Sequence, residues 1–233
     1  MNKERVQEIL SKVKLEGRTA LMEYEAAEIF KAYGLSLAPS ILARNEEEAL
    51  KAAEDLGYPV VLKISSPDIL HKTEAKGVKV NLKTPDEVQG AFKEIIQNAR
   101  NYKADARIVG VLVQKMAAPG GTEVIFGAIR DPQFKQVVMF GLGGIFVEVL
   151  KDVTFRVAPV TVEEAKKMAL EIQASSILKG VRGQGPRDLD SLADSLSRLS
   201  QLVVDFPEIK ELDANPVMLY QSGLLVVDAR ILL

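Results

Sequence analysis

The sequence predicts a mixed α/β (α+β) protein built from two tightly associated subdomains. Strand-like apolar segments alternate with amphipathic helices, and a turn-rich run at residues 117–121 interrupts the pattern half-way. The chain has 233 residues, 47% of them hydrophobic, which is enough for a substantial core. We expect residues 23–116 to form the first subdomain, and residues 1–22 together with 117–233 to form the second.

The first part of the chain predicts helices. Near the N-terminus, apolar residues share one helical face: Val6, Ile9, Leu10 and Val13. Thr19 is expected to cap a second helix that ends at Gly34. Residues 35–42 are typical of a short extended segment. Asn45 then caps a third helix, which ends at Gly57.

The next part of the chain, up to residue 115, predicts three strands and one helix. The three expected strands are residues 59–64, 77–82 and 108–115. The run Thr84-Pro85-Asp86-Glu87 predicts a helix start, because it combines a capping Thr, a Pro in the first turn and acids near the positive end of the helix dipole. That helix continues to about Arg100. Together these elements predict one α/β unit.

The second half is expected to be richer in strands. The predicted strands are residues 122–129, 136–140, 209–214, 217–220 and 224–231. Thr161 with Glu164 forms a capping box that begins one helix, and residues 188–204 carry the leucine spacing of another.

Composition excludes several classes of protein. The 30 Lys and Arg residues nearly balance the 32 Asp and Glu residues, which excludes a polybasic nucleic-acid binder. The absence of cysteine excludes disulfides, a thiolate nucleophile and Cys-ligated metals. The single histidine, His71, excludes a multi-histidine metal site. The N-terminus lacks the features of a secretory signal, so we expect a cytoplasmic protein.

The C-terminal strands carry a candidate metal site. Asp213 and Asn215 are two residues apart on a strand and therefore share a face. Asp228 lies in the apolar run VVDAR, where a carboxylate is costly unless it is paired or binds a cation. Carboxylate and amide oxygens suit Mg²⁺. The alternative is structural: Asn215 stabilises the turn before Pro216, and Asp228 pairs with a base such as Arg230.

The strand at 59–64 and the loop after it carry a candidate phosphate site. Lys63 comes late in the apolar strand and can present a positive charge to a phosphate, or it can be an edge-strand lysine that discourages aggregation. The loop at residues 65–77, expected to be flexible, holds His71, Lys72 and Lys76. It is not a Walker A loop. His71 is either a catalytic imidazole or a structural residue.

The run Gln114-Lys115-Met116 ends a strand at the expected subdomain junction. Its backbone groups could pair with an adenine edge while Met116 packs on the ring, since domain junctions favour ligand clefts. A plain connection explains the same residues equally well. The nearby glycines at 141–144 do not match a G-x-G-x-x-G dinucleotide fingerprint.

Taken together, these segments resemble one known family. YPVVLKISSPDILHKTEAKGVKVNL (58–82), EVIFGAIRDPQFKQVVMFGLGGIFVEVLKDVTFRVAPV (123–160), RLSQLVVDFPEIKELDANPVM (198–218) and the terminal VVDARI resemble the ATP-grasp domain of nucleoside-diphosphate-forming acyl-CoA synthetases. The likeness covers nearly the whole chain. Within this family, the chain resembles the β subunits of ADP-forming acetyl-CoA synthetases, which are related to succinyl-CoA synthetase β subunits. It implies an ATP-grasp fold with the nucleotide cleft between the two subdomains.

The resemblance also implies roles for individual residues. Lys63 matches the lysine that contacts nucleotide phosphates, Glu123 matches a ribose contact, and Gln114, Lys115 and Met116 match the adenine hinge. Asn215 and Asp228 match Mg²⁺ ligands, and Asp213 matches an acid near the phosphohistidine. His71 matches a second histidine that accepts phosphate. The Gly-rich phosphate lid of many ATP-grasp enzymes is replaced by this His-bearing loop.

The implied reaction is acyl-CoA + ADP + phosphate ⇌ acid + CoA + ATP, with Mg²⁺ and ATP or ADP bound to this chain. The implied partner is an α subunit, in an expected α₂β₂ assembly, that binds CoA and the acyl group and carries a phosphohistidine loop. No nucleic acid or membrane partner is expected. Two alternatives stay open: a stand-alone ATP-grasp carboxylate ligase that forms an acyl-phosphate, and a non-catalytic nucleotide-binding regulatory subunit.

Overall fold

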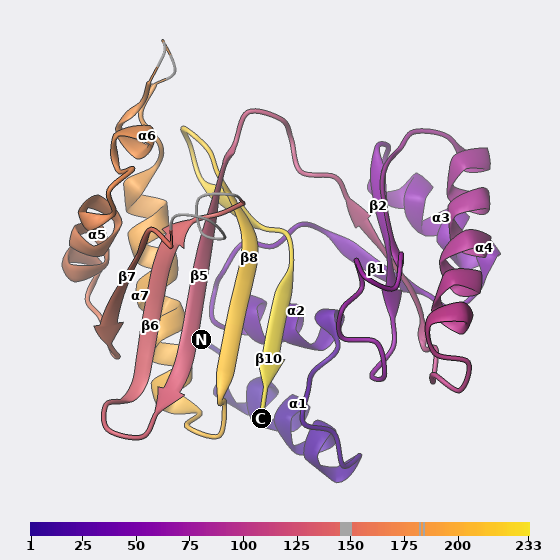
Figure 1. Cartoon of the computed structure of the whole chain (residues 1–233), viewed down its shortest axis with the longest axis horizontal. Coiled ribbons are helices and arrows are strands. Elements are labelled where there is room, and N and C mark those ends of the chain that lie inside the picture. Colours follow the sequence, from indigo (N-terminus) through magenta and orange to yellow (C-terminus); the bar gives the residue numbers. More distant parts are fainter. Residues whose placement is uncertain (145–150, 182, 184) are drawn as a thin grey trace. The chain divides into compact units, whose positions relative to one another are not determined.

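The computed structural model describes residues 1–144, 151–181, 183 and 185–233 (Figure 1). Its chain contacts divide into two compact units. Unit 1 comprises Met1–Leu21, Glu25–Leu37 and Ala118–Leu233, and unit 2 comprises Met22–Tyr24 and Ala38–Ala117. Within the described ranges, no helix is long and apolar enough to cross a bilayer.

Unit 2 is built on a four-stranded antiparallel sheet in the order β1-β4-β2-β3. Its strands are β1 (Ser40–Ala43), β2 (Val60–Ser65), β3 (Val78–Leu82) and β4 (Gly110–Lys115). Helices α3 (Glu46–Leu56) and α4 (Pro85–Tyr102) cover one face. Leu62, Ile95 and Val113 are buried in the core between the helices and the sheet. The other face of β2 therefore carries Val61, Lys63 and Ser65, because side chains alternate along a strand.

Unit 1 is built on a six-stranded sheet in the order β10-β8-β5-β6-β7, with β9 also paired to β8. Its strands are β5 (Thr122–Asp131), β6 (Lys135–Leu142), β7 (Val153–Val157), β8 (Glu211–Leu219), β9 (Leu224–Val226) and β10 (Ala229–Leu232). Its helices are α1 (Lys3–Leu15), α5 (Val162–Glu171), α6 (Ser176–Lys179), α7 (Leu189–Asp205) and α2 (Glu23–Ala32) apart from its first two residues, which belong to unit 2. In Figure 1, α7 runs behind β6 and β5, where its leucines meet Phe126 and Phe140 in the core.

The second helix belongs to a different unit from the one expected. The sequence placed residues 23–116 in one subdomain, whereas residues 25–37 pack with unit 1. The physical reason is that Ile29, Phe30 and Tyr33 of this segment are buried in the core of unit 1. The helix also begins at Glu23, so the cap expected at Thr19 is wrong.

Other boundaries differ at the C-terminus. The two strands expected at 209–214 and 217–220 are one strand, β8, which continues through a cis Asn215–Pro216 peptide bond and a register irregularity against β5. The single strand expected at 224–231 is two, β9 and β10, with Asp228 between them. The sequence did not predict β7. The helix caps expected at Asn45, Thr84 and Thr161 are confirmed, since each side chain accepts a hydrogen bond from the backbone three residues later. Asp188, which was not predicted as a cap, caps α7 in the same way.

Candidate functional site

Lys63 is a buried charge in the middle of a sheet. Strand β2 lies between β4 and β3, so the edge-strand interpretation of this lysine is wrong. Only 4% of Lys63 is exposed, and its Nζ donates to Glu23 Oε1 at 2.6 Å. A buried ammonium needs such a partner, because removing an unpaired charge from water is very costly. Packing alone does not explain why a lysine occupies this position.

Several contacts join the loop at residues 65–77 to the rest of unit 2. Ile69 and Ala75 point into the helix-side core, and Asp68 Oδ2 accepts a 2.7 Å hydrogen bond from the Arg107 backbone. At the end of the loop, the Gly77 N–H donates to Lys72 O at 2.8 Å. These contacts fix the backbone on either side of His71.

The imidazole of His71 faces outward from this anchored backbone. Its side chain is 61% exposed, and its Nδ1 lies 3.8 Å from Glu74 Oε1, beyond hydrogen-bond distance. The carbonyl oxygen of His71 accepts from the Ala75 N–H at 3.1 Å, so the residue is held by its main chain. The result is an accessible imidazole on a positioned loop.

The predicted adenine hinge is partly occupied by contacts within unit 2. The Lys115 N–H donates to Pro39 O at 2.8 Å, and the Met116 N–H donates to Pro59 O at 3.2 Å. The Lys115 ammonium donates to the carbonyl oxygens of Gly57 and Tyr58 at 2.7 and 2.9 Å, and Gln114 is buried. These two backbone N–H groups are therefore committed to carbonyl oxygens within unit 2.

Unit 1 brings the other predicted group together. Asp213 and Asn215 lie on either side of the buried Ala214 on β8, so both face away from the helix-covered side. The Asn215 N–H donates to Asp228 O at 3.2 Å, which places the start of β10 beside β8 at this point. Across the sheet, Asp213 pairs in register with Arg230 on β10 and Gly127 on β5. The alternation predicted from the sequence is confirmed.

The electrostatics of this group suit a cation. Burial, followed by the charge of Asp228, raises the pKa of Asp213 to about 6, although Arg230 acts in the opposite direction. Among the described residues there is no cluster of three His, Asp or Glu side chains placed to hold a metal by themselves. Mg²⁺ commonly uses one or two protein oxygens plus phosphate and water, so Asp228 and Asn215 fit a nucleotide-bound Mg²⁺.

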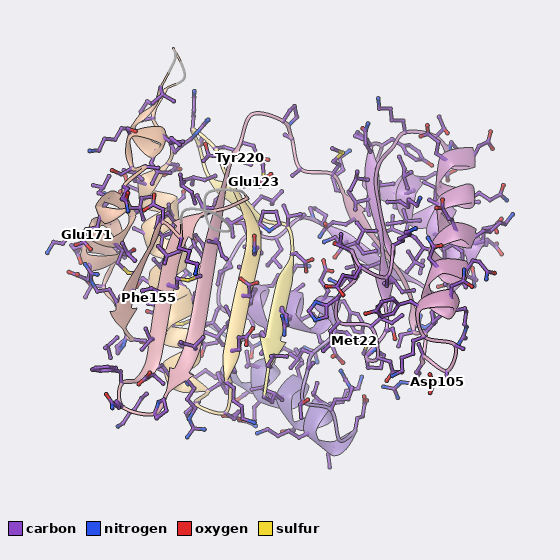
Figure 2. All side chains as sticks on the ribbon, in the orientation of Figure 1. Met22, Asp105, Glu123, Phe155, Glu171 and Tyr220 are labelled. Carbon is purple, nitrogen blue, oxygen red and sulfur yellow. The ribbon has the colours of Figure 1, made fainter. Side chains whose placement is uncertain are left out.

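Glu123 lies on β5 near two glycines of the run 141–144. The Gly143 N–H donates to Glu123 O at 2.8 Å, and a Cβ at Gly143 would stand 3.0 Å from Glu123 Cβ. Glycine is therefore needed for the close approach of this segment to β5. Figure 2 shows Glu123 and Tyr220 at the same end of this sheet. The exposed carboxylate of Glu123 can accept hydrogen bonds from ligand hydroxyls.

An apolar hollow of about 220 Å³ lies on the sheet face that carries Asp213. Ile129, Met139 and Phe155 line it beside Asp213. Phe155, labelled on β7 in Figure 2, is 50% exposed. Sequence reasoning did not find this hollow, because its residues come from four strands.

Sequence reasoning also missed Glu23. Its carboxylate is buried and accepts from both Lys63 and Lys72. In the sequence it is one of several glutamates near the start of a helix, and its partners are 40 and 49 residues away. No local pattern distinguishes it from Glu25 or Glu28.

The fold and these side chains define an ATP-grasp protein, and a family model described as an ATP-grasp domain matches residues 12–233. The β subunit of ADP-forming acetate–CoA ligase I from Pyrococcus furiosus is 52% identical to this chain over 229 residues, which cover 98% of each chain. The dinucleotide-forming acetyl-coenzyme A synthetase 1 of Ca. Korarchaeum cryptofilum, solved with coenzyme A, Ca-AMPCP and HgCl⁺, matches with a TM-score of 0.94 and 46% identity over 97% of this chain and 99% of that chain.

A second structure of the Korarchaeum enzyme holds coenzyme A and Mg-AMPPCP, with its phosphohistidine segment pointing towards the nucleotide binding site. It matches with a TM-score of 0.86 and 44% identity over 98% of this chain and 99% of that chain. The chain belongs to the ATP-grasp family and, within it, to the family of ADP-forming acetate–CoA ligase β subunits. The resemblance drawn from the sequence is confirmed.

Proposed function

We propose that this chain is the nucleotide-binding β subunit of an ADP-forming acyl-CoA synthetase, with acetyl-CoA as the expected substrate. With an α subunit it would catalyse acyl-CoA + ADP + phosphate ⇌ acid + CoA + ATP. The observation that carries the proposal is the match to a named β subunit over 98% of both chains. The buried Lys63 and the outward-facing His71 in unit 2 are the chemical groups that such a subunit needs.

In unit 2, His71 is the proposed phosphoryl acceptor and donor. In the direction of ATP formation, the N–P bond of phosphohistidine breaks while a bond forms between phosphorus and a β-phosphate oxygen of ADP. The electron pair of the broken bond stays on the imidazole, which leaves as a neutral group because its second nitrogen keeps its proton. Imidazole suits this task because its phosphoryl bond is labile. Lys63 would contact the nucleotide phosphates and stabilise the charge on the transferring group.

In the same unit, the run Gln114-Lys115-Met116 is the proposed border of the adenine ring. The carbonyl oxygens of this segment can accept from the adenine amino group, and Met116 can pack on the ring face. In unit 1, Glu123 is the proposed ribose contact, because its exposed carboxylate accepts hydrogen bonds from hydroxyls.

The C-terminal strands of unit 1 would hold Mg²⁺ through Asn215 and Asp228. The bound ion would neutralise the phosphate charge of the nucleotide. Asp213 lies near Asn215 and Asp228, but we assign it a different role. Its carboxylate, at the edge of the apolar hollow, can accept a hydrogen bond from the imidazole of a partner subunit's phosphohistidine segment.

The partner is proposed to be an α subunit in an α₂β₂ assembly. The β-subunit name of the Pyrococcus relative implies a second subunit, and the Korarchaeum structure has a phosphohistidine segment that points towards the nucleotide binding site. The α subunit would bind CoA and the acyl group. Since the substrates of the complex include nucleotides and CoA esters, the reaction would take place in the cytoplasm.

The test is ATP formation by the reconstituted complex. We expect ATP from acetyl-CoA, ADP, phosphate and Mg²⁺ when this chain is co-purified with its α subunit, and none from either chain alone. His71→Ala should abolish ATP formation, whereas Lys76→Met in the same loop should leave it largely intact. ATP-dependent turnover of a free acid by the isolated chain would instead indicate a stand-alone ligase, and nucleotide binding without phosphoryl transfer in the complex would indicate a regulatory subunit.

A further inference from the structure

We propose that Glu23 is a positioning residue for phosphoryl transfer, because its carboxylate ties the phosphate-contacting lysine to the loop that presents His71. The inference rests on the proposed role of His71. It adds a residue that touches neither nucleotide nor phosphoryl group and acts through the two lysines that it holds.

The geometry is a two-armed bridge inside unit 2. Glu23 Oε1 accepts from Lys63 Nζ at 2.6 Å, and Glu23 Oε2 accepts from Lys72 Nζ at 2.5 Å. The Glu23 side chain is 7% exposed and that of Lys72 is 19% exposed, so water screens these charges poorly. One carboxylate thus fixes the distance between a strand lysine and a loop lysine.

The loop arm of the bridge acts next to the reactive residue. Lys72 directly follows His71, and consecutive Cα atoms are about 3.8 Å apart, so a shift of Lys72 moves His71 with it. The Gly77 N–H also donates to Lys72 O at 2.8 Å. Lys72 is therefore held at its ammonium group and at its carbonyl oxygen, while the neighbouring imidazole faces solvent.

Glu23 also permits the burial of Lys63. Without its carboxylate, two ammonium groups that water screens poorly would lose a shared negative partner, which is costly for buried charges.

Glu25 provides a matched control two residues along the same helix. It is also a buried acid, and its Oε2 accepts from Arg18 Nη1 at 2.7 Å. This pair lies within unit 1, whereas the bridge of Glu23 lies within unit 2. Replacing either acid with Gln removes a buried negative charge from the same helix, but only one replacement cuts the bridge.

The experiment compares Glu23→Gln and Glu25→Gln in the full chain. Three quantities are measured for each: the rate of ³²P incorporation from Mg-[γ-³²P]ATP, the Kd of Mg-ATP, and hydrogen exchange of a peptide spanning residues 65–77. For Glu23→Gln we expect at least about tenfold slower labelling, since misplacement of a reacting group is costly, together with faster loop exchange and a Kd no weaker than that of the unmodified chain. Glu25→Gln should change none of the three.

A second variant keeps the inference testable if Glu23→Gln does not fold. Lys72→Met removes the loop arm of the bridge and leaves the Lys63–Glu23 pair, and it should also slow labelling and speed loop exchange. The proposal would be overturned if the folded variant, Glu23→Gln or Lys72→Met, showed the same labelling rate and the same loop exchange as Glu25→Gln. A failure of the proposed function would give a different result. The His71→Ala variant would then still be labelled with ³²P, regardless of how fast the loop exchanges in Glu23→Gln.

Discussion

Asp213→Asn should make the chain more stable at neutral pH while it impairs function. Burial and the nearby Asp228 raise the pKa of Asp213 from 3.8 to about 6 in the folded chain. Below about pH 4, the carboxyl is protonated in both the folded and unfolded states and contributes no pH dependence. Between about pH 4 and pH 6 the unfolded chain releases the proton first, so the free energy of unfolding falls as pH rises.

The size of the effect follows from the shift. About two pKa units at about 1.4 kcal/mol per unit give a penalty of about 3 kcal/mol above pH 6, and about 1 kcal/mol at pH 4.5. Asparagine has nearly the same shape and no charge. We therefore expect Asp213→Asn to stabilise the chain at pH 7.5 by up to about 3 kcal/mol, and by clearly less at pH 4.5.

The assay is urea unfolding of the unmodified chain and of Asp213→Asn in EDTA buffers at several pH values between 3 and 8. Asp188→Asn serves as a control of opposite sign. Hydrogen bonds from the Ser191 and Gly223 backbones lower the pKa of Asp188, so its replacement should destabilise the chain at pH 7.5 and much less near pH 3. A stability gain for Asp213→Asn that does not change with pH would refute the electrostatic reasoning.

Three other substitutions test local features. Lys115→Met removes an ammonium that donates to two carbonyl oxygens at the end of α3, and should lower the free energy of unfolding by about 2 kcal/mol in urea titrations; an unchanged midpoint would contradict that structural role. Gly77→Ala places a Cβ 2.4 Å from Ile64 Cγ2 and should lower stability by about 1–3 kcal/mol by the same measurement, whereas Gly90→Ala, in open space on α4, should not. Asp228→Asn should weaken Mg-ATP binding at least about tenfold in calorimetry without loss of folding; unchanged affinity would remove Asp228 from the metal site.

The sequence was sufficient where the signal is local. The caps at Asn45, Thr84 and Thr161 depend on a side chain and a backbone group three residues apart, so the sequence predicted them directly. That Asp213 and Asn215 share one face of the sheet follows from strand alternation in the same way. The ATP-grasp resemblance came from long ordered segments, and the comparisons confirm it.

The sequence was insufficient where partners are distant. Whether Lys63 lies on an edge or a central strand depends on strand order, which periodicity does not encode. The assignment of residues 25–37 to unit 1 depends on which core buries Ile29 and Phe30. Glu23 is distinguished only by lysines that lie 40 and 49 residues further along the chain.

The central claim is that this chain binds the nucleotide and exchanges its phosphoryl group with His71. The most direct measurement is ³²P transfer from Mg-[γ-³²P]ATP to the isolated chain, followed by peptide mapping at alkaline pH and a separate test of the label's stability in acid. We predict an acid-labile label on the peptide that contains His71, its release as ATP when ADP is added, and no label on His71→Ala at unchanged nucleotide affinity. An equally labelled His71→Ala variant would contradict the account.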